Sequence, residues 1–204
     1  MSVHTSPLRV DQKLIAGLIP SGARVLDVGC GNGALLHYLV HTKGVDGRGM
    51  ELSQEGVNAS VARGLSVVQG NADTDLADYP DGAFDYVVLS QTLQATFAPH
   101  VVLEQMARIG KRLIVSIPNF GYWRVRLQLL LRGRMPVTES LVFEWYDTPN
   151  IHFCTLKDFR KLCRKLDITL VEAMPLDSLG AALPDWQRGS ANVLAAQAVF
   201  VGGR

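Results

Sequence analysis

Short apolar runs alternate with amphipathic stretches along most of the chain. The apolar runs, rich in Val, Ile and Leu, are predicted as strands at residues 24–28, 45–51, 65–69, 84–90, 111–117, 168–174 and 193–201. The first five lack a regular polar alternation, which is typical of strands buried on both faces. Helical patterns separate them at residues 34–42, 53–63 and 99–109. This order predicts an α/β fold with a doubly wound, mostly parallel seven-stranded sheet.

The ends of these helical stretches carry local signals. Gly44, Gly64 and Gly110 follow the three stretches, at positions where a left-handed glycine commonly ends a helix. Ser53 is placed to cap the start of the second helix with its hydroxyl.

The pattern changes after the fifth strand. Residues 118–153, called the insertion below, are irregular and aromatic, with one short amphipathic helix expected at 122–131. Thr155 and Asp158 then form a capping-box pattern that opens another helix. No helical pattern separates the last two strand candidates. We therefore expect an antiparallel pair at the sheet edge, joined by the loop 175–192.

Composition limits the class of protein. The chain has 204 residues, 48% hydrophobic and 19% charged, which suits one folded domain over residues 1–204. The net charge of +1 gives no electrostatic argument for binding nucleic acid or a membrane surface. The N-terminus has no signal-peptide pattern, and no apolar run approaches the ~20 residues of a membrane span.

Cysteine and histidine positions do not predict a metal site. Cys30, Cys154 and Cys163 have neither metal-ligand nor disulfide-framework spacing, and their odd number suits a reducing compartment. His37 and His41 lie one helical turn apart, but no third ligand accompanies them, so a solvated helix face is the better interpretation. We expect a soluble cytoplasmic protein that needs no metal.

A glycine-rich turn follows the first strand. Residues 24–33 read RVLDVGCGNG, with Gly29, Gly31 and Gly33 between an apolar strand and a helix. Such a turn lets a ligand approach the backbone, and the helix directs free N–H groups toward it. The spacing is neither the dinucleotide fingerprint nor a phosphate loop. It resembles motif I of class I S-adenosylmethionine (SAM)-dependent methyltransferases.

Polar residues follow the next strands at the edge where ligands bind in open α/β sheets. Glu51 can accept hydrogen bonds from ribose hydroxyls, and Asp73 can accept a hydrogen bond from the amine of an adenine. Ala72 is small enough to leave room for the adenine ring. Alone, Glu51 could be a helix-dipole residue and Asp73 a turn former. Together these positions match methyltransferase motifs I to IV in order and spacing. The predicted nucleoside-site residues are Asp27, Gly29, Cys30, Gly31, Asn32, Gly33, Glu51, Leu52, Asn71, Ala72, Asp73 and Ser90.

Within that set, Asp27 is expected to be structural, accepting backbone N–H bonds that hold the loop. Cys30 is expected to be a small packing residue, because no local His or Lys is arranged to activate it.

Catalytic residues are not visible in the sequence. Residues 90–94, SQTLQ, contain no acid or base, and the Asn/Asp-Pro-Pro-Tyr motif of N-methyltransferases is absent. Methyl transfer can depend mainly on holding a nucleophile in line, so this absence does not exclude it. His152 could act as a base at the pocket mouth, but a hydrogen bond that orients its loop is the favoured interpretation.

Two aromatic segments carry a more specific resemblance. SIPNFGYWR (116–124) and EWYDTPNIHFCT (144–155), with the motifs above, resemble the MetW family of methionine biosynthesis proteins over about residues 8–200. The resemblance implies SAM or S-adenosylhomocysteine as ligand. It also implies a complex with a MetX-type homoserine O-acyltransferase, which activates homoserine for methionine synthesis. It implies no established methyl acceptor.

Three interpretations remain open. The chain is a SAM-binding subunit that assists or regulates the acyltransferase, a methyltransferase acting on a small molecule, or an interaction module with a vestigial ligand site. The intact set of Gly29, Gly31, Gly33, Glu51 and Asp73 argues against the last. Because SAM derives from methionine, a SAM-binding partner could act as a sensor through linkage.

The insertion is predicted to form a partner or lid surface, since Trp, Tyr and Arg dominate interface hot spots. An alternative for Trp123 and Trp145 is a second core beneath the insertion. The residues assigned to this surface are Tyr122, Trp123, Arg124, Arg126, Trp145, Tyr146 and His152.

Overall fold

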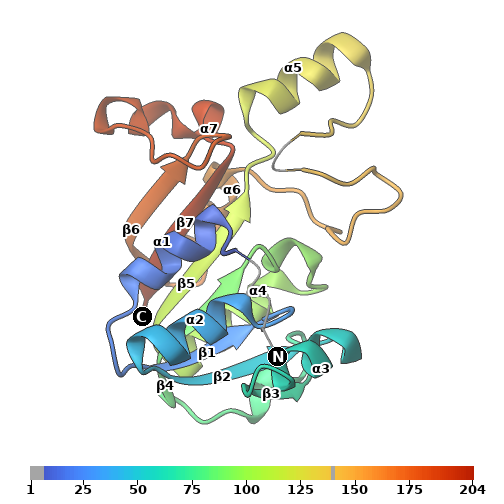
Figure 1. Ribbon diagram of the computed structural model, residues 1–204. Helices are drawn as coiled ribbons and strands as arrows, with labels where there is room; N and C mark the ends of the chain where they lie inside the picture. Colours follow the sequence, from blue (N-terminus) through green and yellow to red (C-terminus); the bar gives the residue numbers. More distant parts are fainter. Residues whose placement is uncertain (1–6, 139–140) are drawn as a thin grey trace.

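The computed structural model describes residues 7–138 and 141–204, which fold around a seven-stranded sheet of order β3-β2-β1-β4-β5-β7-β6 (Figure 1). The strands are β1 Arg24–Val28, β2 Asp46–Glu51, β3 Ser66–Gln69, β4 Phe84–Ser90, β5 Gly110–Pro118, β6 Thr169–Leu176 and β7 Gln197–Gly203. The α-helices are α1 Val10–Leu18, α2 Ala34–Lys43, α3 Gln54–Val61, α4 Pro99–Ile109, α5 Trp123–Arg132, α6 Leu156–Lys165 and α7 Ala191–Leu194. Short 3-10 turns are η1 Asp75–Asp78, η2 Leu93–Ala95 and η3 Asp185–Ser190.

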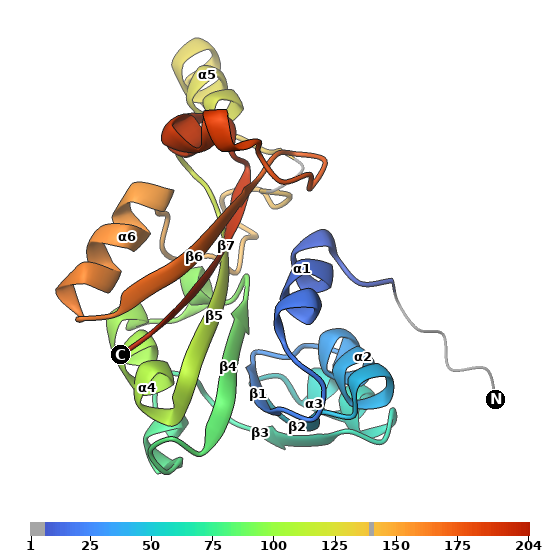
Figure 2. The same cartoon turned by 90° about the vertical axis from the view of Figure 1, so that its left-hand side faces the viewer.

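The predicted sheet is confirmed. Strands β1 to β5 pair in parallel, and β7 pairs antiparallel with both β5 and β6. Helices α1 and α2 cover one face and α4 and α6 cover the other, while α5 projects beyond the end of the sheet (Figure 2). No helix in the described ranges is long and apolar enough to cross a membrane.

Both sheet faces are buried over β1, β4 and β5, as the unalternating strands predicted, but the prediction is wrong for the edge strand β3, which is mostly exposed. Val25 and Val88 pack in the cluster beneath α1 and α2, with Ile15. Their sequence neighbours Leu26 and Val87 face the opposite cluster beneath α4 and α6. Successive strand residues point to opposite faces, so apolar side chains are required at consecutive positions.

Most predicted caps are present. The Ser53 hydroxyl accepts the Gly56 N–H at 3.0 Å, and Thr155 forms the capping box with Asp158. Gly44 ends α2 in the left-handed conformation. The prediction for Gly110 is wrong, because this residue is extended and starts β5. A Cβ there would lie 2.7 Å from Cγ2 of Val87, so close strand packing explains this glycine.

The prediction near the C-terminus needs two corrections. The last strand covers Gln197–Gly203 rather than 193–201, and the segment before it contains η3 and α7 rather than only a loop. The apolar run ANVLAA at 191–196 satisfies either a strand or a short helix, and periodicity cannot distinguish them over so few residues.

Helix α1 was not predicted, and a buried carboxylate anchors it. Asp11 accepts hydrogen bonds from the hydroxyls of Ser90, at 2.7 Å, and Ser116, at 2.8 Å, and from the Arg9 guanidinium. Burial by itself would raise the pKa of Asp11, but the bonds and charge of Arg9 and the two hydroxyls hold it below its ordinary value. The N-terminus of α1 is thereby tied to the ends of β4 and β5.

We expect Asp11→Ala to lower the free energy of unfolding by about 2–4 kcal/mol, because two buried hydroxyls and a guanidinium lose their acceptor. Urea denaturation at pH 7 measures this. The matched control is Asp185→Ala, which removes an exposed aspartate that forms an ion pair with Arg188 and should change stability by less than about 0.5 kcal/mol. Equal stability of the two variants would contradict the anchoring role.

Candidate functional site

A cavity of about 320 Å³ lies at the carboxyl ends of the first four strands. Six of the predicted nucleoside-site residues line it, namely Gly29, Glu51, Leu52, Asn71, Ala72 and Asp73. The sequence did not predict the part of the wall that comes from Thr92, Ala95 and Phe97 beyond β4 and from Pro149 and Asn150 of the insertion. The insertion therefore closes one side of this cavity.

Strand register brings the predicted residues together. Val28 is level with Met50 on β2 and with Leu89 on β4, so the next residues of all three strands meet at one edge. Gly29 is left-handed, with φ of 69°, and donates its N–H to the Met50 carbonyl. A Cβ at Gly29 would lie 2.7 Å from Thr92, so a side chain there would displace the cavity wall.

The Glu51 carboxylate connects the glycine turn to α3. One oxygen accepts the Gly31 N–H at 2.7 Å, and the other accepts the Ser53 N–H at 2.9 Å. A carboxylate has about four acceptor positions, so these bonds leave capacity for hydroxyl groups of a ligand. Glu51 thus shapes the cavity and lines it.

Asp73 also has a structural role that the sequence did not predict. Its two oxygens accept the N–H groups of Phe97, at 3.0 Å, and Ala98, at 2.8 Å, just before α4. Asn71 holds the turn by accepting the Asp73 N–H at 2.9 Å. These bonds fix the wall between β3 and α4.

The other six predicted residues lie outside the cavity lining: Asp27, Cys30, Gly31, Asn32, Gly33 and Ser90. Ser90 donates to Asp11, and Asn32 accepts the Ala34 N–H at the start of α2. Burial, with the nearby charges of Asp27 and Glu51, raises the pKa of the Cys30 thiol to about 12. Such a thiol is unreactive, in agreement with a packing role.

Asp27 is the most unusual group near the cavity. Its side chain is 2% exposed, and its Oδ1 has no hydrogen-bond partner among the described residues. The expectation that it holds the loop through backbone N–H groups is therefore wrong for this oxygen. Burial raises the pKa of Asp27 to about 7; Glu51 and Asp11 add to this, and Arg9 opposes it. A buried acceptor without a donor suits a positively charged partner.

The contacts of Arg9 were not predicted from the sequence. Its Nε and Nη2 donate to Asp11, Nη2 also donates to Ser90, and its charge reaches Asp27. Its Nη1 donates to none of the described residues. A single arginine ahead of an unrecognised helix gives no sequence signal, so only the fold reveals its place.

The partner-surface residues divide into two groups. Tyr122 is 4% exposed and packs with Val125 and Leu141, so it supports the insertion from inside. Trp145 and Tyr146 are 69% and 72% exposed, so the second-core alternative does not describe Trp145.

The cationic residues of this set make local contacts. The Arg124 guanidinium lies over the half-exposed Trp123 ring, and Arg126 donates to the Gly121 carbonyl at 2.6 Å. His152 contacts the Phe97 carbonyl through Nε2 at 3.3 Å, which is a loop-orienting contact, and it does not line the cavity.

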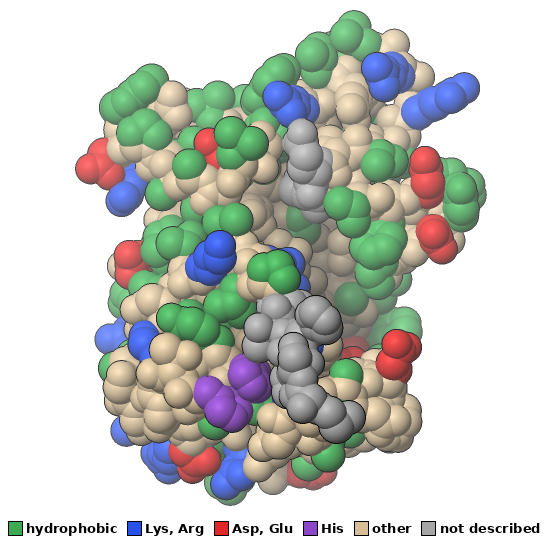
Figure 3. Space-filling view, in the orientation of Figure 1, with side chains coloured by type: hydrophobic (Ala, Val, Ile, Leu, Met, Phe, Trp, Pro, Cys, Tyr) green, Lys and Arg blue, Asp and Glu red, His purple; other side chains and the backbone are tan. Residues whose placement is uncertain are grey.

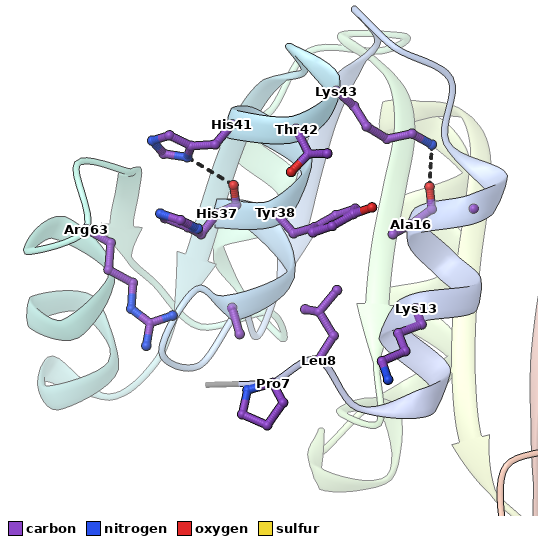
Figure 4. Close-up of a pocket in the computed structure, with 12 residues that line it drawn as sticks. Pro7, Leu8, Lys13, Ala16, His37, Tyr38, His41, Thr42, Lys43 and Arg63 are labelled. Carbon is purple, nitrogen blue, oxygen red and sulfur yellow. Dashed lines mark hydrogen bonds between the residues drawn. The ribbon is translucent and has the colours of Figure 1, made fainter. Parts of the chain in front are cut away.

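A separate cleft of about 640 Å³ lies between α1 and α2 (Figure 4). It is lined by Lys13, His37, His41, Lys43 and Arg63 and by none of the predicted nucleoside-site residues. Lys43 is occupied there, donating to carbonyls at the end of α1. The two histidine rings stack with centroids 4.1 Å apart, and no cluster of three His, Cys, Asp or Glu ligands occurs in the described chain.

The architecture and the cavity define a class I methyltransferase fold. A SAM-dependent methyltransferase from Mesorhizobium loti superposes with a TM-score of 0.71 at 15% identity, covering 96% of this chain and 98% of that one. The [4+2]-cyclase SpnF superposes with a TM-score of 0.65 at 18% identity, covering 94% and 78%. The fold alone therefore does not specify methyl transfer.

Sequence comparison identifies the family. Residues 9–201 match the family described as methionine biosynthesis protein MetW, and the chain belongs to this family. A bifunctional methionine biosynthesis protein MetXA/MetW from Rhodopirellula baltica is 36% identical over 174 residues, 81% of this chain but 28% of that protein. A ubiquinone biosynthesis O-methyltransferase from Xanthomonas oryzae pv. oryzae is 34% identical over 122 residues, 56% of this chain and 50% of the enzyme. The chain thus spans half or less of these relatives.

We expect Asp27→Asn to remove a pH-dependent loss of stability. The folded protein binds the Asp27 proton more tightly than the unfolded chain does. The pKa of Asp27 is about 7 in the folded state, against an ordinary value of 3.8. Its contribution to stability is therefore greatest at low pH and falls as pH rises through 7. Relative to wild type, the variant should gain about 2–3 kcal/mol between pH 5 and pH 8 in urea unfolding.

The control for this measurement is Asp46→Asn, a substitution of an exposed aspartate at the start of β2. It should follow the wild-type pH profile. An Asp27→Asn profile parallel to wild type would show that the buried carboxyl does not titrate near neutrality.

Proposed function

We propose that this chain is a SAM- or S-adenosylhomocysteine-binding protein of methionine biosynthesis that assists or regulates a MetX-type homoserine O-acyltransferase. One observation carries the proposal: the cavity has a nucleoside-like end, and its lining residues Val28 and Gly29 directly follow the buried, unpartnered Asp27. Meanwhile the only acidic side chains among its described lining residues, Glu51 and Asp73, hold backbone N–H groups. This arrangement suits binding better than acid–base catalysis.

The lining residues fit the nucleoside half of SAM. Glu51 would accept the ribose hydroxyls, and the turn at Asn71 and Asp73 would border the adenine. Asp27 does not line the cavity, but it directly precedes the lining residues Val28 and Gly29, and the positive charge of Arg9 opposes the rise that burial causes in its pKa. We propose that this anionic and cationic pair complements the ammonium and carboxylate of the amino-acid end of the ligand. When bound, SAM supplies a methyl group on a positively charged sulfur.

The acyltransferase partner is supported by gene fusion. The Rhodopirellula baltica relative is named as a single MetXA/MetW protein, and this chain matches 28% of it. Two activities joined in one chain commonly work together. We place both in the cytoplasm, where the three free cysteines of this chain would stay reduced.

The insertion offers a surface for that partner. Hydrophobic side chains gather over α5 at the top of the molecule (Figure 3), and Leu130 there is 80% exposed. Exposed Leu127, Leu131, Trp145 and Tyr146 extend the apolar surface. Large exposed apolar side chains clustered on one projecting element mark a protein interface.

The same insertion touches the ligand cavity, which gives a route for regulation. Pro149 and Asn150 line the cavity, and the N–H groups of Ile151 and His152 donate to the Gln94 carbonyl at 2.9 and 3.0 Å. A ligand that contacts this segment of the insertion would change the relative free energies of the segment's conformations. Ligand binding and partner binding would then be coupled, and each would alter the affinity for the other by the same factor.

A second candidate function is methyl transfer to a small molecule. Similarity to an enzyme named ubiquinone biosynthesis O-methyltransferase favours it, and proximity alone can supply much of the rate of such a reaction.

We expect Glu51→Gln to weaken S-adenosylhomocysteine binding about 5- to 150-fold, because a charge-assisted acceptor for ribose hydroxyls becomes a neutral amide. Isothermal titration calorimetry measures the affinity. Glu55→Gln, on the first turn of α3, is the control and should bind like wild type. Wild-type protein that does not bind, or a Glu51→Gln variant that binds as tightly as the control, would remove the proposed site.

We expect this chain to co-purify with the homoserine acyltransferase and to change its specific activity, with a further change when SAM is added. Leu130→Glu should weaken the complex at least tenfold, because it introduces a charge into the apolar surface. The control Val171→Glu alters a half-exposed residue on the edge strand β6. If both variants bind the acyltransferase as wild type does, the interface lies elsewhere on the molecule.

A further inference from the structure

A second cavity, of about 120 Å³, lies beneath the insertion and adjoins the first. The two cavities share three lining residues, Gln91, Pro149 and Asn150. A molecule in the second cavity would therefore lie against a molecule in the first across this shared wall.

The second cavity has an aromatic and uncharged lining. Phe120 and Phe153 pack with ring centroids 4.7 Å apart, and Phe143 and Trp145 complete the aromatic wall. None of the described lining residues carries a charge. A charged guest would lose its hydration here without a compensating ion pair, so the lining selects an uncharged one.

Gln91 stands where the two cavities meet, and its conformation is unusual. Its φ is 54°, in the left-handed region that residues other than glycine rarely adopt. The backbone is held there because its N–H donates to the carbonyl and hydroxyl oxygens of Ser116, both at 3.0 Å. Strained residues that the surroundings hold in place gather at functional sites.

The Gln91 side chain offers one polar group to a guest. Its Nε2 donates to Oε1 of Gln197 at 2.7 Å, which fixes the amide. Its Oε1 accepts from none of the described residues. A guest with a hydroxyl group could donate to this oxygen while its ring occupies the aromatic wall.

We propose that the second cavity binds a small, uncharged aromatic molecule that carries a hydroxyl group, with that hydroxyl directed to Gln91 and the first cavity. An engineered protein cavity of about 150 Å³ lined by apolar residues binds benzene, so this smaller cavity has room for one ring at most. Phe143, Trp145 and Phe153 are partly exposed, which gives the ring an entry from the insertion side. This proposal rests on the second candidate function, methyl transfer to a small molecule, because the proposed SAM-binding cavity adjoins the second cavity.

Phenol is the probe, with benzene and benzoate as matched compounds, each titrated into the full chain and followed by ligand-observed NMR. We expect phenol to bind about fivefold more tightly than benzene, because only phenol can donate to Gln91, and at least tenfold more tightly than benzoate. Gln91→Leu should bring the phenol and benzene affinities to within twofold of each other.

A filling variant tests the location. Val142→Trp places a large ring at an exposed position of the lining and should weaken phenol binding at least tenfold. Leu130→Trp, exposed on α5 outside the lining, is the control and should bind phenol as wild type does. Circular dichroism melting of each variant confirms that it is folded.

The proposal is overturned if phenol does not bind, if benzoate binds equally well, or if Val142→Trp binds phenol like wild type. If the acyltransferase covers Trp145 and phenol does not bind, the cavity would instead receive a side chain of the partner protein. S-adenosylhomocysteine binding is measured on the same samples. Its absence alongside phenol binding would contradict the proposed function and leave the aromatic site standing.

Discussion

The carboxylate of Glu51 is the contact on which the cavity at the strand ends depends. By accepting N–H groups from Gly31 and Ser53, it joins the turn after β1 to the start of α3 and sets the separation of two strands' ends. Three glycines in a turn would otherwise be free to adopt many conformations, because glycine carries the largest backbone entropy. The same carboxylate lines the cavity, so the shape of the site and its chemistry come from one residue.

The sequence predicted those features of the fold that depend on residues close together in the chain. Unbroken apolar strands, a glycine turn and hydroxyl caps depend on local spacing, so the sheet, Ser53 and the Glu51 edge followed from the sequence alone. Contacts between distant segments were not visible. Asp11 accepts a hydrogen bond from Ser116, which lies 105 positions away in the chain. The helix that carries Asp11 has no sequence pattern that distinguishes it from an irregular polar segment. Gly110 matches the pattern of a helix cap, but close packing between strands also requires a glycine, and the sequence does not distinguish the two causes.

The site combines groups that cost stability with groups that secure it. Asp11 and Asp27 are both buried carboxylates, but Asp11 accepts bonds from Arg9, Ser90 and Ser116, whereas Oδ1 of Asp27 has no donor among the described residues. A fold that only needed stability would place an apolar or amide side chain there. Under the proposed function, the unpartnered carboxyl would be retained for a cationic ligand, and the insertion would respond to ligand binding because Pro149 and Asn150 form a wall of the neighbouring cavity.

The most direct test of this account is the proton balance of SAM binding. Calorimetric titrations at pH 7 in two buffers of different ionisation enthalpy measure the protons released when SAM binds. Because the pKa of Asp27 is about 7 before binding, a cation beside it should drive off about half a proton more from wild type than from Asp27→Asn. SAM binding with the same proton balance in both proteins would contradict the account.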